Sequence, residues 1–451
     1  MAHTGRTMTD WLITNALIVN EGRRFSGDLR IRNGRIERIE GEIPVLPGEQ
    51  VLDARGRWLL PGMIDDQVHF REPGLEHKAT IESESRACLA GGITSFMEMP
   101  NTKPPAVNAP ALEDKYARGA RSSRVNYAFY LGATNDNLAD IQRLDPRSAP
   151  GIKVFMGAST GNMLVDNPVT LDAIFRDAPT PIITHCEDTP IITANEEAAR
   201  ARWGEDIPAE QHPLIRSREA CLKSTELAIA LARRHGTRLH VLHISTADEL
   251  ALFTPGPLRG KRITAETCVH FLHFSDADYA RLGHRIKCNP AIKTAADRAA
   301  ITRALAEGRI DVLATDHAPH LASEKANPYT SAPSGLPLVQ YALQAAFERV
   351  FDGELTLERV VEAVSHAPAT LFDVHERGFL REGFHADLVL VDPESPHAVT
   401  ADEVLSKCGW SPFEGTTFRS SIAATFVNGQ LGWNEGRLDD SVRGQRLVFA
   451  R

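Results

Sequence analysis

Residues 58–74, WLLPGMIDDQVHFREPG, join a short apolar run, Trp58–Ile64, to a polar segment that begins at Asp65. Seven more apolar runs follow, and helical stretches such as 81–90 and 217–235 separate several of them. Alternating strands and helices are typical of parallel βα units. Eight runs favour an α/β fold with a closed (β/α)₈ TIM-type barrel over an open doubly wound sheet. No Gly-x-Gly-x-x-Gly or Walker loop follows the first run, which argues against nucleotide binding. The later runs are Thr94–Met99, Tyr127–Tyr130, Ile152–Phe155, Pro181–Thr184, Leu239–Leu242, Ile263–Glu266 and Asp311–Ala314.

The two ends of the chain share a different pattern of short alternating runs. Asn33-Gly34 and Asn428-Gly429 each lie between two such runs. An Asn-Gly pair between two strands is the strongest short-range signal for a β-hairpin. We therefore predict one small β-sandwich-like domain from residues 1–57 and 380–451, and a barrel domain of residues 58–379. Two unrelated terminal additions are the alternative.

Composition narrows the class of protein. The 451 residues are 42% hydrophobic and 24% charged, which excludes a collagen-like chain, a coiled coil and a mainly disordered chain. The 50 basic and 59 acidic residues give a net charge of −9, so we expect no nucleic-acid and no membrane partner. No apolar run reaches about 18 residues, and the polar first ten residues are unlike a signal peptide. Six cysteines without a Cys-x-x-Cys pair indicate reduced thiols, and we expect a cytoplasmic protein.

Side chains with metal-binding chemistry stand at four of the runs. Lys153, His185, His243 and Asp316 belong to the fourth, fifth, sixth and eighth runs or follow them directly. In a (β/α)₈ barrel the carboxyl ends of the strands meet at one mouth, which carries the catalytic groups. Imidazoles and carboxylates are ligands for a borderline ion such as Zn²⁺. The sequence therefore predicts a metal site at the barrel mouth.

Two more residues and one modification belong to this prediction. Gln67 and His69 are two positions apart on an extended segment, so their side chains point the same way. The ammonium of Lys153 cannot bind a cation, so this residue can join the site only as a carbamate formed with CO₂. An ion pair inside the barrel mouth is the alternative for Lys153. By default Glu266, Cys268 and His270 receive structural roles, and His317 is expected to orient its neighbours.

Six segments form an ordered set along the chain: QVHFREPG (67–74), MPNT (99–102), KVFM (153–156), THCE (184–187), LHIS (242–245) and TDHAPH (315–320). Together they resemble the dihydroorotase family of the amidohydrolase superfamily. The resemblance implies a metal-dependent (β/α)₈ barrel. It also implies reversible cyclisation of N-carbamoyl-L-aspartate to L-dihydroorotate in pyrimidine biosynthesis.

The resemblance implies a role for each matching residue. His69 and Asp316 match ligands of a first metal, His185 and His243 match ligands of a second, and Lys153 matches a bridging carbamylated lysine. Asp316 also matches the catalytic proton shuttle. Arg71, Asn101 and His320 match positions that hold the substrate carboxylate, Asn289 matches a contact to the pyrimidine ring, and Gly335 offers backbone contacts from the loop 322–337.

Gln67 departs from the family, whose first-strand motif is His-x-His. An amide oxygen is a poorer ligand for Zn²⁺ than an imidazole nitrogen. We therefore expect Gln67 to be a weak or absent ligand. The first metal site should be weak, differently filled or empty, so that the chain holds one or two Zn²⁺.

Two other functions compete with a dihydroorotase that acts on a small molecule. Hydantoinases, dihydropyrimidinases and allantoinases share the metal residues, but their substrates lack the ring carboxylate that Arg71 would bind. A catalytically silent partner of aspartate transcarbamoylase is the other alternative. Such chains have usually lost several ligands, whereas this chain has lost one, so we predict an enzyme. We expect a homodimer and keep aspartate transcarbamoylase as a candidate partner.

Overall fold

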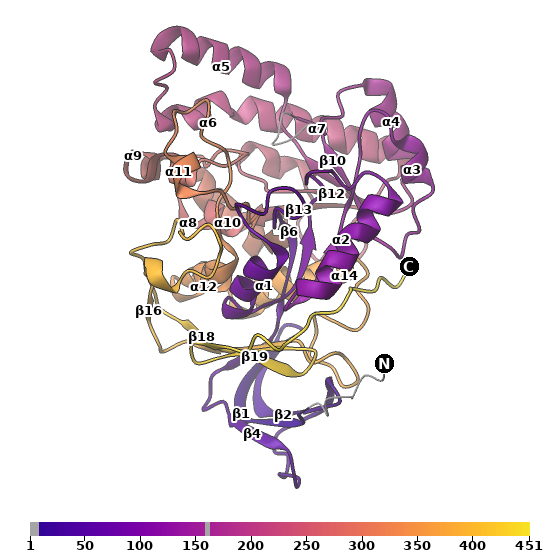
Figure 1. Ribbon diagram of the computed structural model, residues 1–451, viewed down its shortest axis with the longest axis vertical. Helices are drawn as coiled ribbons and strands as arrows, with labels where there is room; N and C mark the ends of the chain where they lie inside the picture. The colour runs from indigo at the N-terminus through magenta and orange to yellow at the C-terminus, as the bar shows by residue number, and fades with distance from the viewer. Residues whose placement is uncertain (1–8, 158–162) are drawn as a thin grey trace.

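The computed structural model describes residues 9–157 and 163–451, and its centre is a barrel of parallel strands (Figure 1). Two hydrogen-bonded sheets, β6-β7-β8 and β9-β10-β11-β12-β13-β14, supply the strands. β8 and β9 are pieces of one barrel strand, because only Tyr130 separates them. The strands are β6 (Met63–Val68), β7 (Ile93–Glu98), β8 (Asn126–Phe129), β9 (Leu131–Gly132), β10 (Ile152–Phe155), β11 (Ile182–His185), β12 (Leu239–Val241), β13 (Ile263–Cys268) and β14 (Val312–Ala314).

The barrel closes between its first and last strands. A parallel bridge joins Val68 to His317, and the backbone N–H of His69 donates to the carbonyl of His317 at 2.7 Å. Below this bridge, Thr315 Oγ1 donates to Asp65 Oδ2 at 2.6 Å. The prediction of an α/β fold with a (β/α)₈ barrel is therefore confirmed.

Helices surround the strands, and local sequence signals set their ends (Figure 1). The Thr80 side chain caps α1, and the Ser217 side chain caps α7. Gly236 ends α7 with a left-handed φ of 66°, as a C-terminal glycine cap does. The other α-helices are α2 (Ala109–Ser122), α3 (Leu138–Gln142), α4 (Pro168–Asp177), α5 (Thr189–Trp203), α6 (His212–Ile215), α8 (Val269–His273), α9 (Tyr279–Leu282), α10 (Ala295–Ala306), α11 (Ala322–Lys325), α12 (Ala342–Phe351), α13 (Leu357–Val361) and α14 (Ala367–Leu371); α1 is Ile81–Ala90 and α7 is Arg218–His235.

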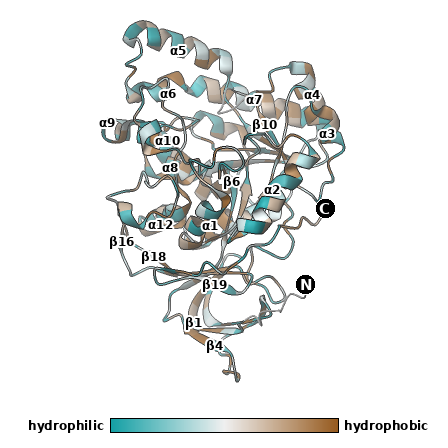
Figure 2. Ribbon diagram, viewed as in Figure 1, coloured by the Kyte–Doolittle hydropathy of each residue, from teal (hydrophilic) through white to brown (hydrophobic). Residues whose placement is uncertain are grey.

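A cluster of apolar side chains occupies part of the barrel interior. Ile64, Met97, Ile183 and Val312 come from strands spread around the barrel, yet they belong to one buried cluster. Such contacts require that these side chains point to the interior. The surrounding helices carry both polar and apolar residues, as Figure 2 shows, which suits helices with one face on the strands. No helix within 9–157 and 163–451 is long and apolar enough to cross a membrane.

Both ends of the chain build one further sheet, which lies below the barrel in Figure 1. Its order is β20-β19-β18-β15-β5-β1-β2-β3, with β4 paired to β1. Asn33-Gly34 and Asn428-Gly429 turn two of its hairpins, and all four residues have positive φ, as predicted for such turns. The strands are β1 (Trp11–Asn20), β2 (Arg23–Arg32), β3 (Arg35–Glu40), β4 (Gln50–Asp53), β5 (Trp58–Pro61), β15 (Leu388–Asp392), β18 (Ser421–Val427), β19 (Gln430–Asn434) and β20 (Arg437–Leu438); β16 (His397–Ala398) and β17 (Thr417–Phe418) form a separate ribbon.

The first apolar run, Trp58–Ile64, corrects one sequence interpretation. It is not one barrel strand: β5 belongs to the terminal sheet and pairs with β1 and β15, whereas β6 begins the barrel at Met63. Apolar character signals burial, but it does not say which sheet buries the strand. The chain passes between the sheets at Gly62, where a side chain would meet Thr94. The proposed domain limits stay predictions, and residues 1–8 lie outside the described residues.

Candidate metal centre and active site

A pocket at the carboxyl ends of the barrel strands gathers most of the residues that the sequence analysis selected. Asn101 and His320 complete the set through hydrogen bonds to two lining residues, His69 and Arg71. The pocket is lined by Gln67, His69, Arg71, Lys153, Phe155, His185, His243, Asn289, Asp316, Ala318, Ser334 and Gly335. The structure therefore brings all the predicted site residues to one place.

Three of these residues have backbone conformations that non-glycine residues seldom adopt. Arg71, His243 and Asp316 have φ values of 71°, 42° and 50°. Each comes just after a barrel strand, so the left-handed turn redirects the chain at the barrel mouth. Such conformations persist only where surrounding structure enforces them, and they cluster at functional sites.

His185 and His243 form one side of the pocket. His185 Nδ1 lies 2.9 Å from His243 Nε2, and His185 Nε2 lies 3.0 Å from Glu187 Oε2. Burial lowers the pKa of both imidazoles, which keeps them in the neutral form that binds metals. Burial would raise the pKa of Glu187, but Arg216, 2.6 Å away, and His185 hold it at about 2. An ionised carboxylate therefore backs His185.

His69, Asn101 and Asp316 form the other side. His69 Nδ1 lies 2.9 Å from Asn101 Oδ1, and His69 Nε2 lies 3.1 Å from Asp316 Oδ1. A carbonyl oxygen only accepts, so Nδ1 carries the proton and the neutral ring directs its Nε2 lone pair at the carboxylate. Burial lowers the pKa of His69, which favours this neutral form.

These donor sets fit the implied metal. A lone pair that faces a carboxylate needs a cation or a proton between the two atoms. Histidines that bind metals usually donate the other ring N–H to an oxygen, as His69 does to Asn101. Neutral imidazoles and carboxylates at a barrel mouth are suitable ligands for Zn²⁺.

Lys153 is buried in the pocket wall. Its Nζ lies 4.7 Å from the centre of the Phe155 ring, and no carboxylate of the described residues comes within 4 Å of it. Burial lowers the pKa of Lys153 to about 8. Free amine is therefore more abundant than for an exposed lysine, and the free amine is the form that reacts with CO₂. The ion-pair alternative finds no partner here, whereas the carbamate stays a prediction.

Gln67 also lines the pocket, and backbone hydrogen bonds fix its place. Its N–H donates to Asp65 Oδ1 at 3.3 Å, and its carbonyl accepts from Thr315 Oγ1 at 3.4 Å. The side-chain Oε1 lies 3.8 Å from the Cys268 thiol, a weak donor. An amide oxygen thus lies where the family motif has an imidazole. Among the described residues, no stronger hydrogen-bond donor than the Cys268 thiol contacts this oxygen.

The wall beside Asp316 is cationic. Arg71 is buried; its Nε donates to the Pro319 carbonyl at 3.1 Å, and its Nη2 lies 2.9 Å from His320 Nε2. Burial lowers the pKa of Arg71 to about 10, so it stays charged at neutral pH. Lys78 Nζ lies 2.9 Å from His320 Nδ1 and pairs with Glu324 at 3.0 Å, so Arg71 carries the wall's net positive charge. This wall is therefore suited to an anionic group of a ligand.

Sequence reasoning missed Arg216 and Lys78. With its amide in the orientation that satisfies its hydrogen bonds, Asn289 accepts from Arg216 Nη2 at 3.1 Å and donates to Ser334 Oγ at 3.0 Å. Arg216 precedes the N-cap of α7, and Lys78 lies in the loop before α1. Neither position carries a local signal, because only the fold brings them to the pocket.

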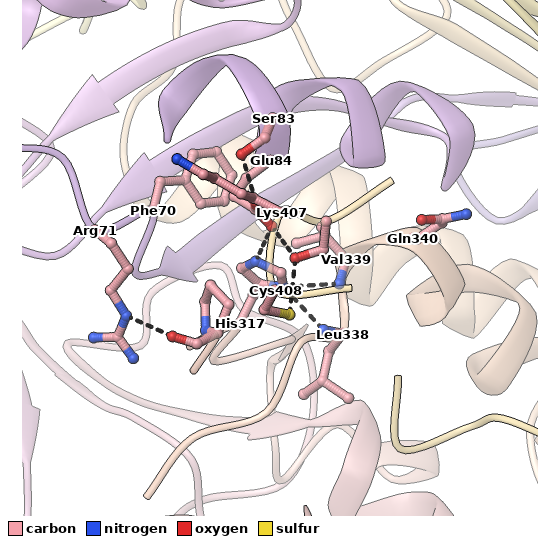
Figure 3. Close-up of polar contacts among 12 residues, drawn as sticks. Phe70, Arg71, Ser83, Glu84, His317, Leu338, Val339, Gln340, Lys407 and Cys408 are labelled. Atoms are coloured by element: carbon pink, nitrogen blue, oxygen red, sulfur yellow. Dashed lines mark hydrogen bonds and ion pairs between the residues drawn. The ribbon is translucent and has the colours of Figure 1, made fainter. Parts of the chain in front are cut away.

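His317 orients its neighbours, as expected. Its Nδ1 accepts from the backbone N–H of Leu338 at 2.9 Å, so its Nε2 carries the proton shared with Glu84 Oε2 at 2.8 Å (Figure 3). Glu84, on α1, also accepts from Ser406 Oγ at 2.6 Å and from the N–H of Lys407 at 3.1 Å. The segment between Asp316 and His320 is thus tied to α1 and to the C-terminal part of the chain.

Comparison with known proteins places the chain in a family. A model of the amidohydrolase family matches residues 58–432. A dihydroorotase from Halobacterium salinarum is 37% identical over 413 residues, which cover 90% of this chain and 94% of that one. An allantoinase from Deinococcus radiodurans is 31% identical, with coverage of 97% and 98%. The structure of an L-hydantoinase (dihydropyrimidinase) from Arthrobacter aurescens has a TM-score of 0.91 at 27% identity, covering 98% of this chain and 100% of that one. The chain belongs to the amidohydrolase family.

Proposed function

We propose that this protein is a cyclic amidohydrolase, and specifically a dihydroorotase that interconverts N-carbamoyl-L-aspartate and L-dihydroorotate. One observation carries the proposal: the buried Arg71–His320 pair forms a cationic wall beside Asp316. A ring carboxylate would fit the guanidinium fork of Arg71, which binds planar carboxylates through two parallel hydrogen bonds. Relatives named dihydroorotase at 31–37% identity support this choice.

The ligand sets on both sides of the pocket are proposed to hold Zn²⁺. His185, His243 and a carbamylated Lys153 would hold one ion, and His69, Asp316 and the weak ligand Gln67 would hold another. Bound Zn²⁺ polarises a carbonyl and brings the pKa of water toward about 7.

The chain's own residues would then carry the proton. In the hydrolytic direction, Asp316 Oδ2, which His69 does not engage, accepts a proton from the attacking water and returns it to the departing ring nitrogen. In the biosynthetic direction, the same oxygen takes a proton from the carbamoyl nitrogen. Arg71 and His320 hold the substrate carboxylate, and Asn289 and the Gly335 backbone contact the ring.

A panel of substrates tests this function. Purified protein should convert L-dihydroorotate faster than hydantoin, dihydrouracil or allantoin, which lack the ring carboxylate. Preference for one of those three would move the protein to the hydantoinase, dihydropyrimidinase or allantoinase class. The similarity to an allantoinase and to an L-hydantoinase is the support for that alternative. No turnover with any of them at any Zn²⁺ concentration would favour a silent partner of aspartate transcarbamoylase.

The remaining expectations stay predictions. A homodimer is tested by light scattering, and association with aspartate transcarbamoylase is tested by co-purification. The six cysteines are all free and buried, which suits the expected cytoplasmic location.

A further inference from the structure

A second group of metal-binding side chains lies inside the barrel. Asp66 on β6, His240 on β12 and Glu266 on β13 are each fully buried, at 0% exposure. One ligand atom from each lies within 4.8 Å of the others. None of the three lines the pocket or belongs to the predicted metal set, and Glu266 had only a structural role in the sequence analysis.

The spacing of the ligand atoms fits an ion. His240 Nε2 lies 3.2 Å from Glu266 Oε2 and 3.4 Å from Asp66 Oδ2. Ligand atoms about 2.0–2.2 Å from a tetrahedral ion are separated by about 3.3–3.6 Å. A second oxygen from either carboxylate would supply the fourth position.

The hydrogen bonds around His240 indicate which ring nitrogen offers its lone pair to the carboxylate side. Thr264 Oγ1 donates to the Leu239 carbonyl at 3.2 Å, so it can only accept from His240 Nδ1, 2.8 Å away. In the neutral form of the ring, the form that binds a metal, Nδ1 therefore carries the proton. The Nε2 lone pair then faces two carboxylates, which is the arrangement of a histidine ligand whose other nitrogen is held by an oxygen.

The charge of the group calls for a cation. Neither carboxylate oxygen of Asp66 has a hydrogen-bond partner among the described residues. No lysine or arginine in 9–157 or 163–451 forms an ion pair with Asp66 or Glu266. Burial and the facing Asp66 raise the pKa of Glu266 well above its ordinary range, so without an ion this group would have to take up a proton. One divalent ion neutralises both carboxylates instead.

We infer that Asp66, His240 and Glu266 bind one divalent transition-metal ion in the barrel interior, separate from the predicted centre at the mouth. Two carboxylates and one imidazole are suitable for Zn²⁺ and for similar first-row ions. The ion links β6 to β12 and β13, neither of which pairs with β6. The role of this ion is to stabilise the barrel. Its binding requires none of the residues proposed to bind substrate.

Anomalous diffraction above the zinc edge tests the site on crystals of the full chain purified with Zn²⁺. A peak between Asp66, His240 and Glu266 is expected. Asp66→Asn should remove this peak and lower the bound zinc by about one ion per chain. Asp311→Asn is the matched control: it changes a buried carboxylate next to barrel strand β14, but Asp311 pairs with Lys261 and lies outside both the group and the pocket. Equal zinc content in the two variants would overturn the inference.

A second set of variants separates this site from the one at the mouth. The double variant His185→Ala, His243→Ala should lose zinc at the mouth and keep the interior ion, whether or not the wild type turns over dihydroorotate. Adding Glu266→Gln should remove that ion and lower the melting temperature in Zn²⁺. If the variants at Asp66 or Glu266 do not fold, the anomalous map of the wild type alone shows whether an ion lies between Asp66, His240 and Glu266. A map without a peak at this position overturns the inference.

Discussion

The two sides of the pocket differ in ligand chemistry although they share one backbone design. His185 and His243 offer two neutral imidazoles, backed by the Glu187–Arg216 ion pair. The opposite side offers one imidazole, a carboxylate and the amide of Gln67. A left-handed residue turns the chain on both sides, at His243 and at Asp316. The fold thus positions both sides alike, and we expect the side chain at position 67 to set a difference in metal affinity between them.

The largest expected effect comes from Asp316, on the side of the pocket that contains Gln67. Asp316→Asn removes both a proposed metal ligand and the proposed proton shuttle. Because acid–base catalysis alone contributes about 10²–10⁴-fold, kcat for dihydroorotate should fall by at least about 10³-fold. Steady-state kinetics measures the loss, and circular dichroism checks the fold. Asp248→Asn, which changes an exposed carboxylate, is the control. Undiminished turnover by Asp316→Asn would exclude the shuttle.

Arg71→Ala tests whether the pocket wall beside Asp316 binds the substrate carboxylate. Losing a buried charge-assisted contact costs about 2 kcal/mol or more, so kcat/KM for dihydroorotate should fall about 30-fold or more, mainly through KM. Hydantoin, which has no carboxylate, should be hydrolysed no more slowly than by the wild type. Arg200→Ala on the exposed surface of α5 is the control. An unchanged KM would remove the main support for the dihydroorotase assignment.

Burial that keeps imidazoles neutral should also make stability depend on pH. Burial lowers the pKa of His270 to about 4 from about 6.5, so the unfolded chain binds a proton first as the pH falls. His270 therefore costs the fold about 2 kcal/mol between pH 7 and pH 5, and the loss begins below about pH 6.5. Urea unfolding of the wild type and His270→Asn, both in chelator, measures the difference. Parallel pH profiles of the two proteins would contradict this assignment.

Gln67→His should change activity least, and it tests directly whether position 67 makes the two sides of the pocket differ in zinc affinity. The wild type is expected to hold one tight Zn²⁺ near His185, His243 and Lys153, with a second that is weak or absent. An imidazole at position 67 should raise the zinc content of dialysed protein toward about two ions at the mouth. Activity need not rise, because the surroundings are built around an amide. Gln67→Asn is the control. Two tightly bound ions at the mouth of the wild type would contradict the expected weakness.

Part of this protein could be predicted from the sequence alone. The repeated apolar runs predicted the barrel, and Asn33-Gly34 and Asn428-Gly429 predicted hairpins, because periodicity and turn chemistry act over a few residues. The residues at the strand ends could be selected because a parallel barrel brings all those ends to one mouth. The family resemblance then assigned their roles.

Only the tertiary structure decided the rest. It divided Trp58–Ile64 between two sheets, placed Arg216 beside Asn289, and set Asp66 against His240 and Glu266. His69 and Asp316 are 247 positions apart, and their 3.1 Å contact exists because the barrel closes with one register. Such contacts depend on how distant strands are aligned, and a one-residue shift in a strand would turn its side chains to the other face. The sequence by itself determined which chemistry the mouth contains, whereas closure of the barrel determined which atoms meet.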